Sequence, residues 1–358
     1  MILYISKKII YSFFVLLGTI TLIFFLFNVL PGDPARMMLD KHEDSNQLEL
    51  IKQKYGFDKP LYLQYFLYLN DVSPFSLHHN NDNSFTSLSS GKYQFYLLFN
   101  LSDYKIVFKI PYLRESFVRT NVSVFSILVE TFKNTFILAI TSISIALILG
   151  LFLGVISALY KDSFLDQFIL FNSVLGMSLP SFFASILVAW FFGFLLHDYT
   201  GLNMTGSLYE VDDFGRGSYI QIKNLILPAF TLGIRPLSVI IQLCRNSLLE
   251  VLSLDYVRTA KAKGLGKMTV IFKHALTNSL NPVVTAVSGW FASMLAGAVF
   301  VEYIFAWNGI GKEIVDGLNK MDLPIVMGSV LMISIVFIII NILVDFIYVW
   351  LDPRIRLN

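Results

Sequence analysis

The sequence predicts an all-α integral membrane protein with six transmembrane helices, and three observations lead to this fold class. Of the 358 residues, 55% are hydrophobic and only 15% are charged, whereas soluble domains carry roughly 25% charged residues. Several apolar runs are long enough to cross about 30 Å of hydrocarbon as helices. The basic residues gather in some of the segments between these runs and are sparse in others, a pattern that orients proteins in the bilayer.

Four uncharged runs each give one span. They are Ile9–Leu30, Phe136–Tyr160, Phe168–Leu196 and Pro324–Val344. The first run is followed by Leu-Pro-Gly-Asp-Pro and not by a small-residue cleavage site, so we interpret it as a retained anchor. Two further runs are interrupted but long enough to span. They are Leu225–Cys244, broken by Arg235-Pro236, and Asn281–Val301, whose early proline suits the start of a helix.

The distribution of basic residues gives the orientation of these six spans. An even number of spans places both termini on one side, and the positive-inside rule makes the most basic segments cytoplasmic. The basic residues that decide this are Lys7, Lys8, Lys161, Arg245, Arg258, Lys261, Lys263, Lys267, Lys273, Arg354 and Arg356. Both termini are therefore expected in the cytoplasm.

The spans divide the chain into three regions. Residues 1–30 form an N-terminal transmembrane anchor, and residues 31–133 form a large first extracytoplasmic loop region with short helices and a polar and aromatic insertion. Residues 134–358 form a five-span core with a cytoplasmic loop at 245–280.

Parts of the outer region carry signals of their own. Ser45–Tyr55 is expected to be a short helix, with Ser45 as its N-cap and Gly56 at its C-terminal end. The aromatic stretch Tyr93–Tyr112 either pairs as strands or packs on the membrane surface, and the sequence leaves both alternatives open. His78-His79 lies in a loop rich in Asn and Ser, so we expect both histidines to be solvated and to bind no metal.

The cytoplasmic segment after the fourth span carries most of the functional signal. If residues 255–264 are helical, Val257, Ala260 and Gly264 fall at i, i+3 and i+7 and form a narrow face of small side chains that another surface can approach closely. Gly264 and Gly266 are expected to supply the turn that sends the chain back toward the fifth span. The charges alone do not identify a docking surface, because any cytoplasmic loop of a membrane protein is basic for topological reasons.

Several motifs follow one another along nearly the whole chain. They are Leu-Pro-Gly-Asp-Pro-Ala at 30–35, Ser-Leu-Pro-Ser-Phe at 178–182, Asp-Tyr-Val-Arg-Thr-Ala-Lys-Ala-Lys-Gly-Leu at 255–265, His-Ala-Leu-Thr-Asn at 274–278, Trp-Asn-Gly-Ile-Gly at 307–311 and Asp-Pro-Arg-Ile-Arg at 352–356. Together they resemble the permease subunits of bacterial ABC importers, specifically the dipeptide, oligopeptide and nickel group. The first motif and the large first outer loop resemble the B-type subunit of that group's heterodimer.

The resemblance implies a permease subunit of the bacterial inner membrane that forms half of a pore for peptide-like solutes or nickel and is not an enzyme. The implied partners are a second permease subunit, two cytoplasmic ABC ATPase subunits that bind the ATP and Mg, and an extracytoplasmic solute-binding protein. No cofactor in this chain and no nucleic-acid partner is expected. A cytoplasmic coupling helix between spans four and five would dock on an ATPase through Asp255, Tyr256, Val257, Arg258, Ala260, Lys261, Gly264 and Leu265.

The chain departs from the broader family pattern in two places. The pattern Glu-Ala-Ala with a later Ile-x-Leu-Pro reads Arg258-Thr259-Ala260 and His274–Thr277 here, which is usual for the peptide group. The stretch Ser73–Arg119 is longer than the family's first outer loop, and its role stays open.

Two other classes of protein fit the sequence less well. No phosphate-binding Gly-x-x-x-x-Gly-Lys-Ser/Thr loop occurs in the sequence, so ATP-driven transport requires a separate ATPase. The alternative is an ion-coupled secondary transporter, for which Arg235 and Asp345 are the candidate ionisable groups. Each is better explained as a pore-facing polar or interfacial group that is satisfied locally. For a membrane enzyme, the sequence offers no catalytic residue.

Overall fold

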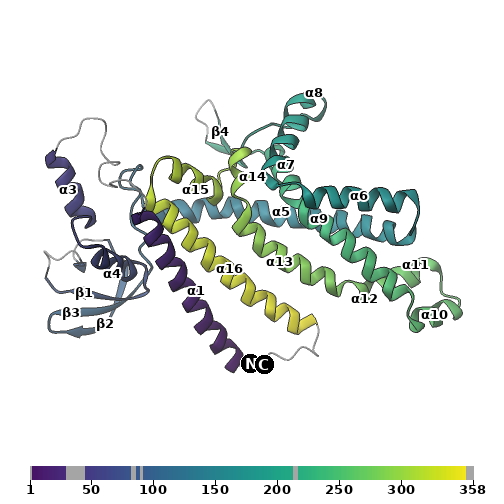
Figure 1. Ribbon diagram of the computed structural model, residues 1–358, viewed down its shortest axis with the longest axis horizontal. Helices are drawn as coiled ribbons and strands as arrows, with labels where there is room; N and C mark the ends of the chain where they lie inside the picture. Colours follow the sequence, from purple (N-terminus) through teal and green to yellow (C-terminus); the bar gives the residue numbers. More distant parts are fainter. Residues whose placement is uncertain (1, 30–44, 82–85, 89–91, 213–216, 352–358) are drawn as a thin grey trace. The chain divides into compact units, whose positions relative to one another are not determined.

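The structure is a computed structural model that describes residues 2–29, 45–81, 86–88, 92–212 and 217–351 (Figure 1). The chain divides into two compact units. Unit 1 comprises Met1–Tyr4, Thr131–Lys312 and Ile335–Asn358, and unit 2 comprises Ile5–Glu130 and Glu313–Ser334. The protein is mostly helical and has several apolar spans, as expected. The predicted all-α class is corrected, because the described residues also form β-strands in two small sheets. The three regions expected from the sequence remain a prediction, since compactness does not test membrane topology.

Four helices are long and apolar enough to cross a membrane. They are α1 (Ile2–Val29), α5 (Val124–Leu159), α9 (Lys223–Leu252) and α16 (Leu323–Leu351). A fifth candidate is α6 (Phe164–Ser178) together with α7 (Ser181–Val188) and the π-helix η2 (Ala189–Leu195), a pair bent by 112°. The shorter α13 (Asn281–Gly297) has 17 residues and is followed by α14 (Val299–Ile304). The described residues therefore contain four to five apolar spans by length and composition.

A proline explains the sharp bend between α6 and α7. Leu179 is extended, at φ −73° and ψ 127°, because the residue before a proline avoids the α region. Pro180 then starts the next helix. The apolar run 168–196, which the sequence presents as a single span, is thus two helices at a steep angle.

Helix α9 shows the opposite behaviour at its own prolines. Pro228 and Pro236 both lie inside this 30-residue helix, which continues through them. The interruption of the apolar run at Arg235-Pro236 therefore does not interrupt the helix. In a membrane helix the backbone groups freed by a proline find other partners, so the residue does not end the helix.

Close approach of helices at glycines packs the core of unit 1. A Cβ on Gly150 would lie 2.6 Å from the Ile240 side chain, and one on Gly154 would lie 2.7 Å from the Cβ of Cys244. Because no side chain fits at either position, α5 and α9 approach each other more closely than larger residues would allow. Helices α6, α7 and α13 also contact α9.

The Trp-Asn-Gly-Ile-Gly motif folds over a buried carboxylate of unit 1. Trp307 and Glu302 are fully buried. The Trp307 Nε1 donates to the Asn134 carbonyl at 3.1 Å, and the Gly311 N–H donates to Glu302 Oε2 at 2.6 Å. A Cβ on Gly309 would lie 2.4 Å from the Glu302 carboxylate, so the motif needs glycine at that position for packing.

Unit 2 contains two short helices and a three-stranded sheet. Helix α3 (Ser45–Tyr55) has the predicted bounds, and Gly56 follows it at φ 74°, which confirms both expectations. After α4 (Leu61–Val72) come the antiparallel strands β1 (Phe75–His79), β2 (Phe95–Leu101) and β3 (Tyr104–Lys109), in the spatial order β1-β3-β2. Of the two alternatives for the aromatic stretch, strand pairing is therefore the one the structure adopts.

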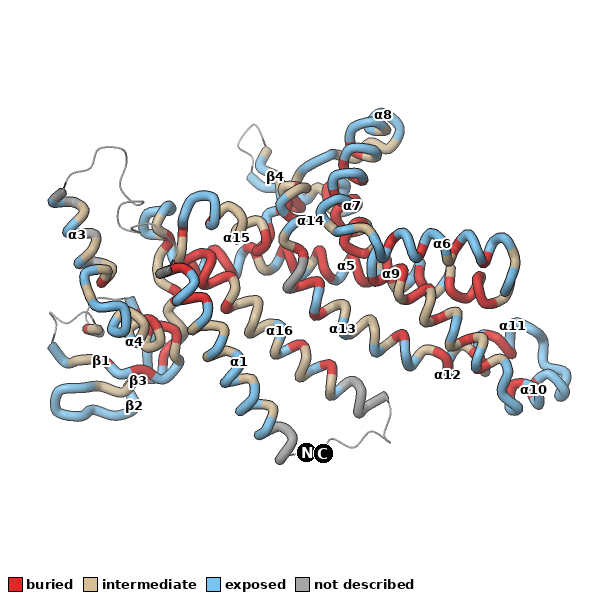
Figure 2. The backbone as a smooth tube through the Cα atoms, in the orientation of Figure 1, coloured by how far each residue is buried: buried red, intermediate tan, exposed pale blue. Residues whose placement is uncertain are grey.

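This sheet turns its apolar face outward. Directly paired residues of antiparallel strands share a face. The pairing places nine residues on the outer face: Phe75, Leu77, His79, Tyr96, Phe99, Leu101, Tyr104, Ile106 and Phe108. Seven of these are large exposed hydrophobic residues, all except His79 and Ile106, and every residue of the edge strand β2 is exposed (Figure 2). The inner face instead buries polar side chains, among them Ser76 and Lys109.

The buried polar groups of unit 2 satisfy one another around Asp71. The Tyr93 hydroxyl donates to Asp71 Oδ1 at 2.9 Å, and Arg114 Nε donates to Oδ2 at 3.1 Å. Lys109 donates to the Asp71 backbone carbonyl at 3.0 Å and lies over the Tyr93 ring. Burial lowers the pKa of Lys109 to about 8 and also raises the pKa of Tyr93, because a low-dielectric surrounding disfavours the charged form of either group.

His78 belongs to this buried set, so the expectation that it is solvated is wrong. It lies in β1 with no exposed surface, and its Nε2 and Nδ1 lie 2.8 Å from the Ser76 hydroxyl and from the Thr86 carbonyl respectively. Burial lowers its pKa. The strand register, which the sequence does not reveal, turns His78 inward and leaves His79 on the outer face.

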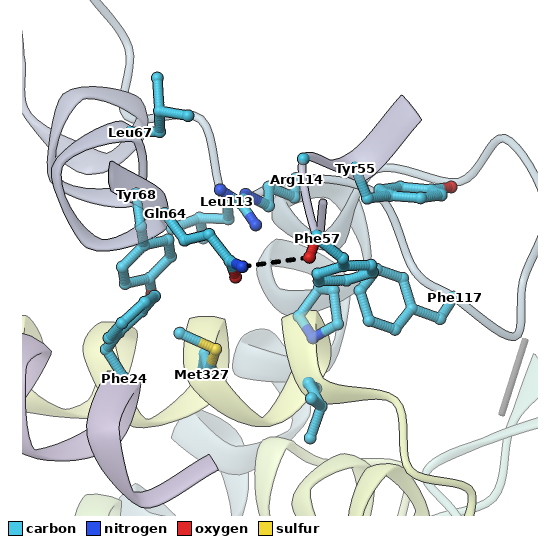
Figure 3. A pocket seen from close by; sticks show the side chains of 13 residues that line it. Phe24, Tyr55, Phe57, Gln64, Leu67, Tyr68, Leu113, Arg114, Phe117 and Met327 are labelled. Atoms are coloured by element: carbon cyan, nitrogen blue, oxygen red, sulfur yellow. Dashed lines mark hydrogen bonds between the residues drawn. The ribbon is translucent and has the colours of Figure 1, made fainter. Parts of the chain in front are cut away.

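A small aromatic pocket lies in unit 2 beside α3 and α4 (Figure 3). Its volume is about 40 Å³, which is room for a few waters at most. Gln64 crosses it and donates from Nε2 to the Phe57 carbonyl at 3.4 Å and to the Lys59 carbonyl at 2.7 Å. This volume is too small for a peptide-sized solute.

The remaining elements are short. They are α8 (His197–Thr200), β4 (Tyr209–Val211), β5 (Ser218–Ile220), α10 (Asp255–Ala262), α11 (Lys267–Thr269), the π-helix η3 (Val270–Leu276), α12 (Thr277–Ser279) and α15 (Ile310–Asn319).

Candidate functional site

The segment singled out by the sequence forms the short helix α10, directly after α9 (Figure 1). Leu254 is extended and precedes the helix, and Asp255 occupies the first turn, where a carboxylate is favourable at the positive end of the helix dipole. Thr259 donates its hydroxyl to the Asp255 carbonyl at 2.9 Å. The Arg258–Asp255 pair, at 3.5 Å, is largely exposed on both sides, so it contributes little to holding the helix.

Two of the three residues expected on an exposed docking face are instead buried inside the chain. Val257 has no exposed surface and Ala260 is 7% exposed. Both belong to one hydrophobic cluster with Leu248 of α9 and Val270 of η3. The prediction that Val257, Ala260 and Gly264 form one exposed face is therefore wrong, because the small residues pack α10 onto its own subunit.

The exposed surface of α10 and of the turn after it comes from the other expected residues. These are Asp255, Tyr256, Arg258, Lys261, Gly264 and Leu265, together with the neighbouring Thr259, Ala262 and Lys263. The surface is polar and basic with two larger apolar side chains, Tyr256 at 42% and Leu265 at 41% exposed. A partner meeting α10 would thus contact charged and aromatic groups.

Gly264 ends the helix and does not belong to it. α10 stops at Ala262, and Gly264 has φ 78° in the left-handed region. Its N–H donates to the Lys261 carbonyl at 3.0 Å, and the Leu265 N–H donates to the Ala260 carbonyl at 3.4 Å. This pair of bonds is the Schellman arrangement that closes a helix C-terminus with glycine.

The chain then returns through α11, η3 and α12 and packs against α10 and α9. Val270, Ile271 and Ala275 are buried on the return. The Tyr256 hydroxyl donates to the His274 carbonyl at 3.4 Å and accepts from Asn278 Nδ2 at 3.2 Å. α10 is therefore held to the rest of unit 1 by the buried Val257 and Ala260 and by the hydrogen bonds of Tyr256.

An ion pair that sequence reasoning missed ties three helices together near this site. Arg245 of α9 donates from Nε and Nη2 to both oxygens of Asp166 of α6, each at 2.7 Å. Ser157 of α5 donates its hydroxyl to the same carboxylate, and the Asp162 N–H donates to it at 2.9 Å. The arginine and aspartate side chains are only 14% and 2% exposed.

One local signal for Asp166 was present in the sequence. Ser163 precedes it by three residues and caps α6, with its hydroxyl accepting from the Asp166 N–H at 3.3 Å. A serine followed three residues later by an acid marks a helix start. Its partner Arg245 lies 79 positions away. From the sequence, Arg245 is recognisable only as one of the basic residues that indicate the cytoplasmic side.

Two family models match this chain. The binding-protein-dependent transport system inner membrane component matches residues 146–357, and the N-terminal region of such membrane components matches residues 1–83. The first match includes α9, α10 and the return helices, and therefore the whole candidate site.

The chain is also similar to named permeases over nearly its whole length. It is 30% identical to the dipeptide transport system permease protein of Alkalihalophilus pseudofirmus, over 99% of this chain and 100% of that protein. It is 34% identical to the dipeptide transport system permease protein of Bacillus subtilis, over 94% and 92%. It is 32% identical to the glutathione transport system permease protein of Pectobacterium atrosepticum, over 99% of each. The chain therefore belongs to the family of inner-membrane components of binding-protein-dependent transport systems, and it is a permease subunit of the peptide ABC importer type.

Proposed function

We propose that this chain forms one half of the transmembrane pathway of an ABC importer for short peptides. The observation that carries the proposal is the full-length similarity to permeases named for dipeptides and for glutathione. Glutathione is itself a small peptide, so the named solutes share one chemical class. Nickel, which the sequence alone left open, is not among those named solutes.

The partners follow from the type of system. A binding-protein-dependent permease receives its solute from an extracytoplasmic binding protein. We propose that a second, related permease completes the pathway, with this chain as the B-type subunit, and that two cytoplasmic ATPases bind the ATP and Mg. The absence of a phosphate-binding loop from this sequence supports an external ATPase.

We propose six spans, with both termini in the cytoplasm. The bent pair of α6 with α7 and η2 would be the third, and α13 with α14 the fifth. The 17 residues of α13 include no charged side chain, which supports a membrane location despite its modest length. The basic residues of α10 and of its return support a cytoplasmic position for the site.

We propose that the exposed residues of α10 and the Gly264 turn dock on the ATPase. Val257 and Ala260 would act from beneath, by fixing α10 to α9 and η3. A helix bound in this way moves with its subunit, so closure of the two ATPases on ATP would tilt the attached spans and switch the pathway from one side of the membrane to the other.

The test is copurification and reconstitution. Extraction in mild detergent should bring down, in stoichiometric amounts, a protein with a phosphate-binding Gly-x-x-x-x-Gly-Lys-Ser/Thr loop. When the complex is reconstituted in liposomes together with its binding protein, it should take up a radiolabelled dipeptide only if ATP is present on the side of the membrane where the ATPase subunits lie. It should not accumulate nickel. A chain that purifies alone and drives uptake from an ion gradient alone would overturn the proposal in favour of a secondary transporter.

A further inference from the structure

An arginine that has no partner among the described residues lies in the middle of an apolar helix long enough to span the membrane. Arg235 stands near the centre of α9 (Lys223–Leu252), one of the four helices apolar enough to span. Its side chain is exposed, and it makes no ion pair or hydrogen bond with any residue that the structure describes. The expectation that it is satisfied locally is therefore not met within these parts of the chain.

Arg235 lines a cavity of unit 1 with a volume of about 130 Å³. The cavity lies where α6 bends into α7 and where both meet α9 and α13, and its walls include Ser181, Thr231, Trp290 and Ser293. It is well above the roughly 10–15 Å³ that one water requires. None of the described residues lining it is acidic, so the positive charge has no counter-ion in the cavity.

A guanidinium at this depth cannot face lipid without a large penalty, and such groups face a water-filled path or an oppositely charged group. The walls beside Arg235 are largely apolar, including Leu179, Leu232 and Met294. In surroundings of low dielectric an anion is attracted to a fixed cation more strongly than in water. Arg235 is therefore arranged to meet an anion that none of the described residues supplies.

We propose that Arg235 binds the carboxylate of a peptide in transit. The inference rests on the proposed peptide-importing function. Every linear peptide with a free C-terminus carries this group, and the planar guanidinium matches a carboxylate with two parallel hydrogen bonds. The cavity takes one end of a short peptide, with Trp290 and Met294 beside the terminal side chain and the hydroxyls of Ser181 and Ser293 beside the polar backbone.

The test uses the whole reconstituted importer with its binding protein and a radiolabelled dipeptide that has a free carboxylate. Arg235→Gln and Arg235→Cys should each lower uptake roughly tenfold or more, the scale expected for loss of a hydrogen-bonded charge. Arg235→Lys keeps the charge but loses the two parallel hydrogen bonds, so its uptake should lie between that of the native importer and that of Arg235→Gln. Lys223→Gln removes a cation from the same helix outside the cavity and should leave uptake within about twofold, as a matched control.

The introduced thiol allows a second measurement, because the native Cys244 is buried. Modification of Arg235→Cys with an aminoethyl thiosulfonate, which restores a positive charge, should recover uptake, whereas a sulfonatoethyl reagent should not. Saturating dipeptide should slow this modification severalfold. Copurification of each variant with the ATPase subunits shows that it has folded and assembled.

Two results would overturn the inference while leaving the proposed function intact. One is uptake by assembled Arg235→Gln within twofold of the native importer. The other is a modified Arg235→Cys importer in which the positively charged adduct restores no more uptake than the negatively charged one. A native importer that takes up no peptide at all would instead overturn the proposed function.

Discussion

Gly264 owes its importance to its backbone and not to the space around it. Its φ of 78° is in the left-handed region, and a Cβ built on it would meet nothing within 4 Å. Any L-residue there costs about 1–2 kcal/mol in conformational free energy. Gly266, two positions on, has an ordinary φ of −60° and equally open surroundings.

These two glycines form a matched pair for mutation. Gly264→Ala should weaken the turn by a factor of roughly 5 to 30 and so lower the amount of peptide taken up per ATP hydrolysed, while membrane insertion persists. Gly266→Ala should couple normally. Equal coupling in both variants, measured in the reconstituted importer, would count against a role for this turn in docking.

At the level of single residues, the sequence predicted the ends of helices better than it predicted which side chains are buried. Gly56 and the bounds of the helix Ser45–Tyr55 were placed correctly because the signals at helix ends are local. Val257 and Ala260 were assigned to an outer face, and the structure buries both. Helical spacing identifies a face of small side chains, but which surface covers that face depends on η3, which returns only after the turn at Gly264.

At the scale of elements, the Asp166–Arg245 pair joins α6 to α9 and, through Ser157, to α5. Breaking such a pair leaves an unpaired charge in a buried place, at about 3–5 kcal/mol. Asp166→Asn is therefore expected to lower the unfolding midpoint of the protein in detergent by roughly 5–15 °C. Intrinsic fluorescence during heating measures this shift.

Two controls distinguish the effect of an unpaired buried charge from the effect of losing any ion pair. Replacing both partners, as Asp166→Leu with Arg245→Met, should recover most of the lost midpoint, because a buried pair exchanged for apolar residues is often neutral. Asp255→Asn breaks the exposed pair with Arg258 and should change the midpoint little. A midpoint unchanged in Asp166→Asn would show that the buried pair does not stabilise the three helices.

The helices could be predicted where hydropathy alone determines their bounds. They could not be predicted where a proline either ends a helix or lies within it. Pro180 separates α6 from α7, whereas Pro228 and Pro236 leave α9 continuous. The residue type is the same in each case. The outcome depends on whether neighbouring helices re-satisfy the freed backbone groups, and that information lies in the packing of unit 1.

For the whole molecule, the membrane location followed from the composition and the apolar runs, and the family from motifs spread along the chain. The number of crossings did not follow from either. A span bent by 112° either crosses the membrane or re-enters on the same side. These two readings reverse the side on which α9 begins. Hydropathy cannot distinguish them, because both halves of the pair are apolar.

Reporter fusions decide the topology. With six spans, alkaline phosphatase fused after residue 220 should be active outside the cytoplasm, and the same enzyme fused after residue 161, after residue 265 or at the C-terminus should be inactive. Green fluorescent protein at those last three positions should fluoresce. Cytoplasmic signals on both sides of the bent pair would mean that α6 and α7 do not cross.

In the sheet of unit 2, the substitutions that impair folding most are the reverse of those expected for an ordinary sheet. In most sheets the apolar side chains carry the fold and the polar ones are replaceable. Here Ser76, His78 and Lys109 are enclosed, and Tyr96 and Phe99 are exposed. When natural variants of this protein are compared, a change of Lys109 to another charged residue is the severe one for folding, and a polar residue at position 96 or 99 is the mild one. Scales that rank variants by hydrophobicity alone therefore give the wrong order for these five residues.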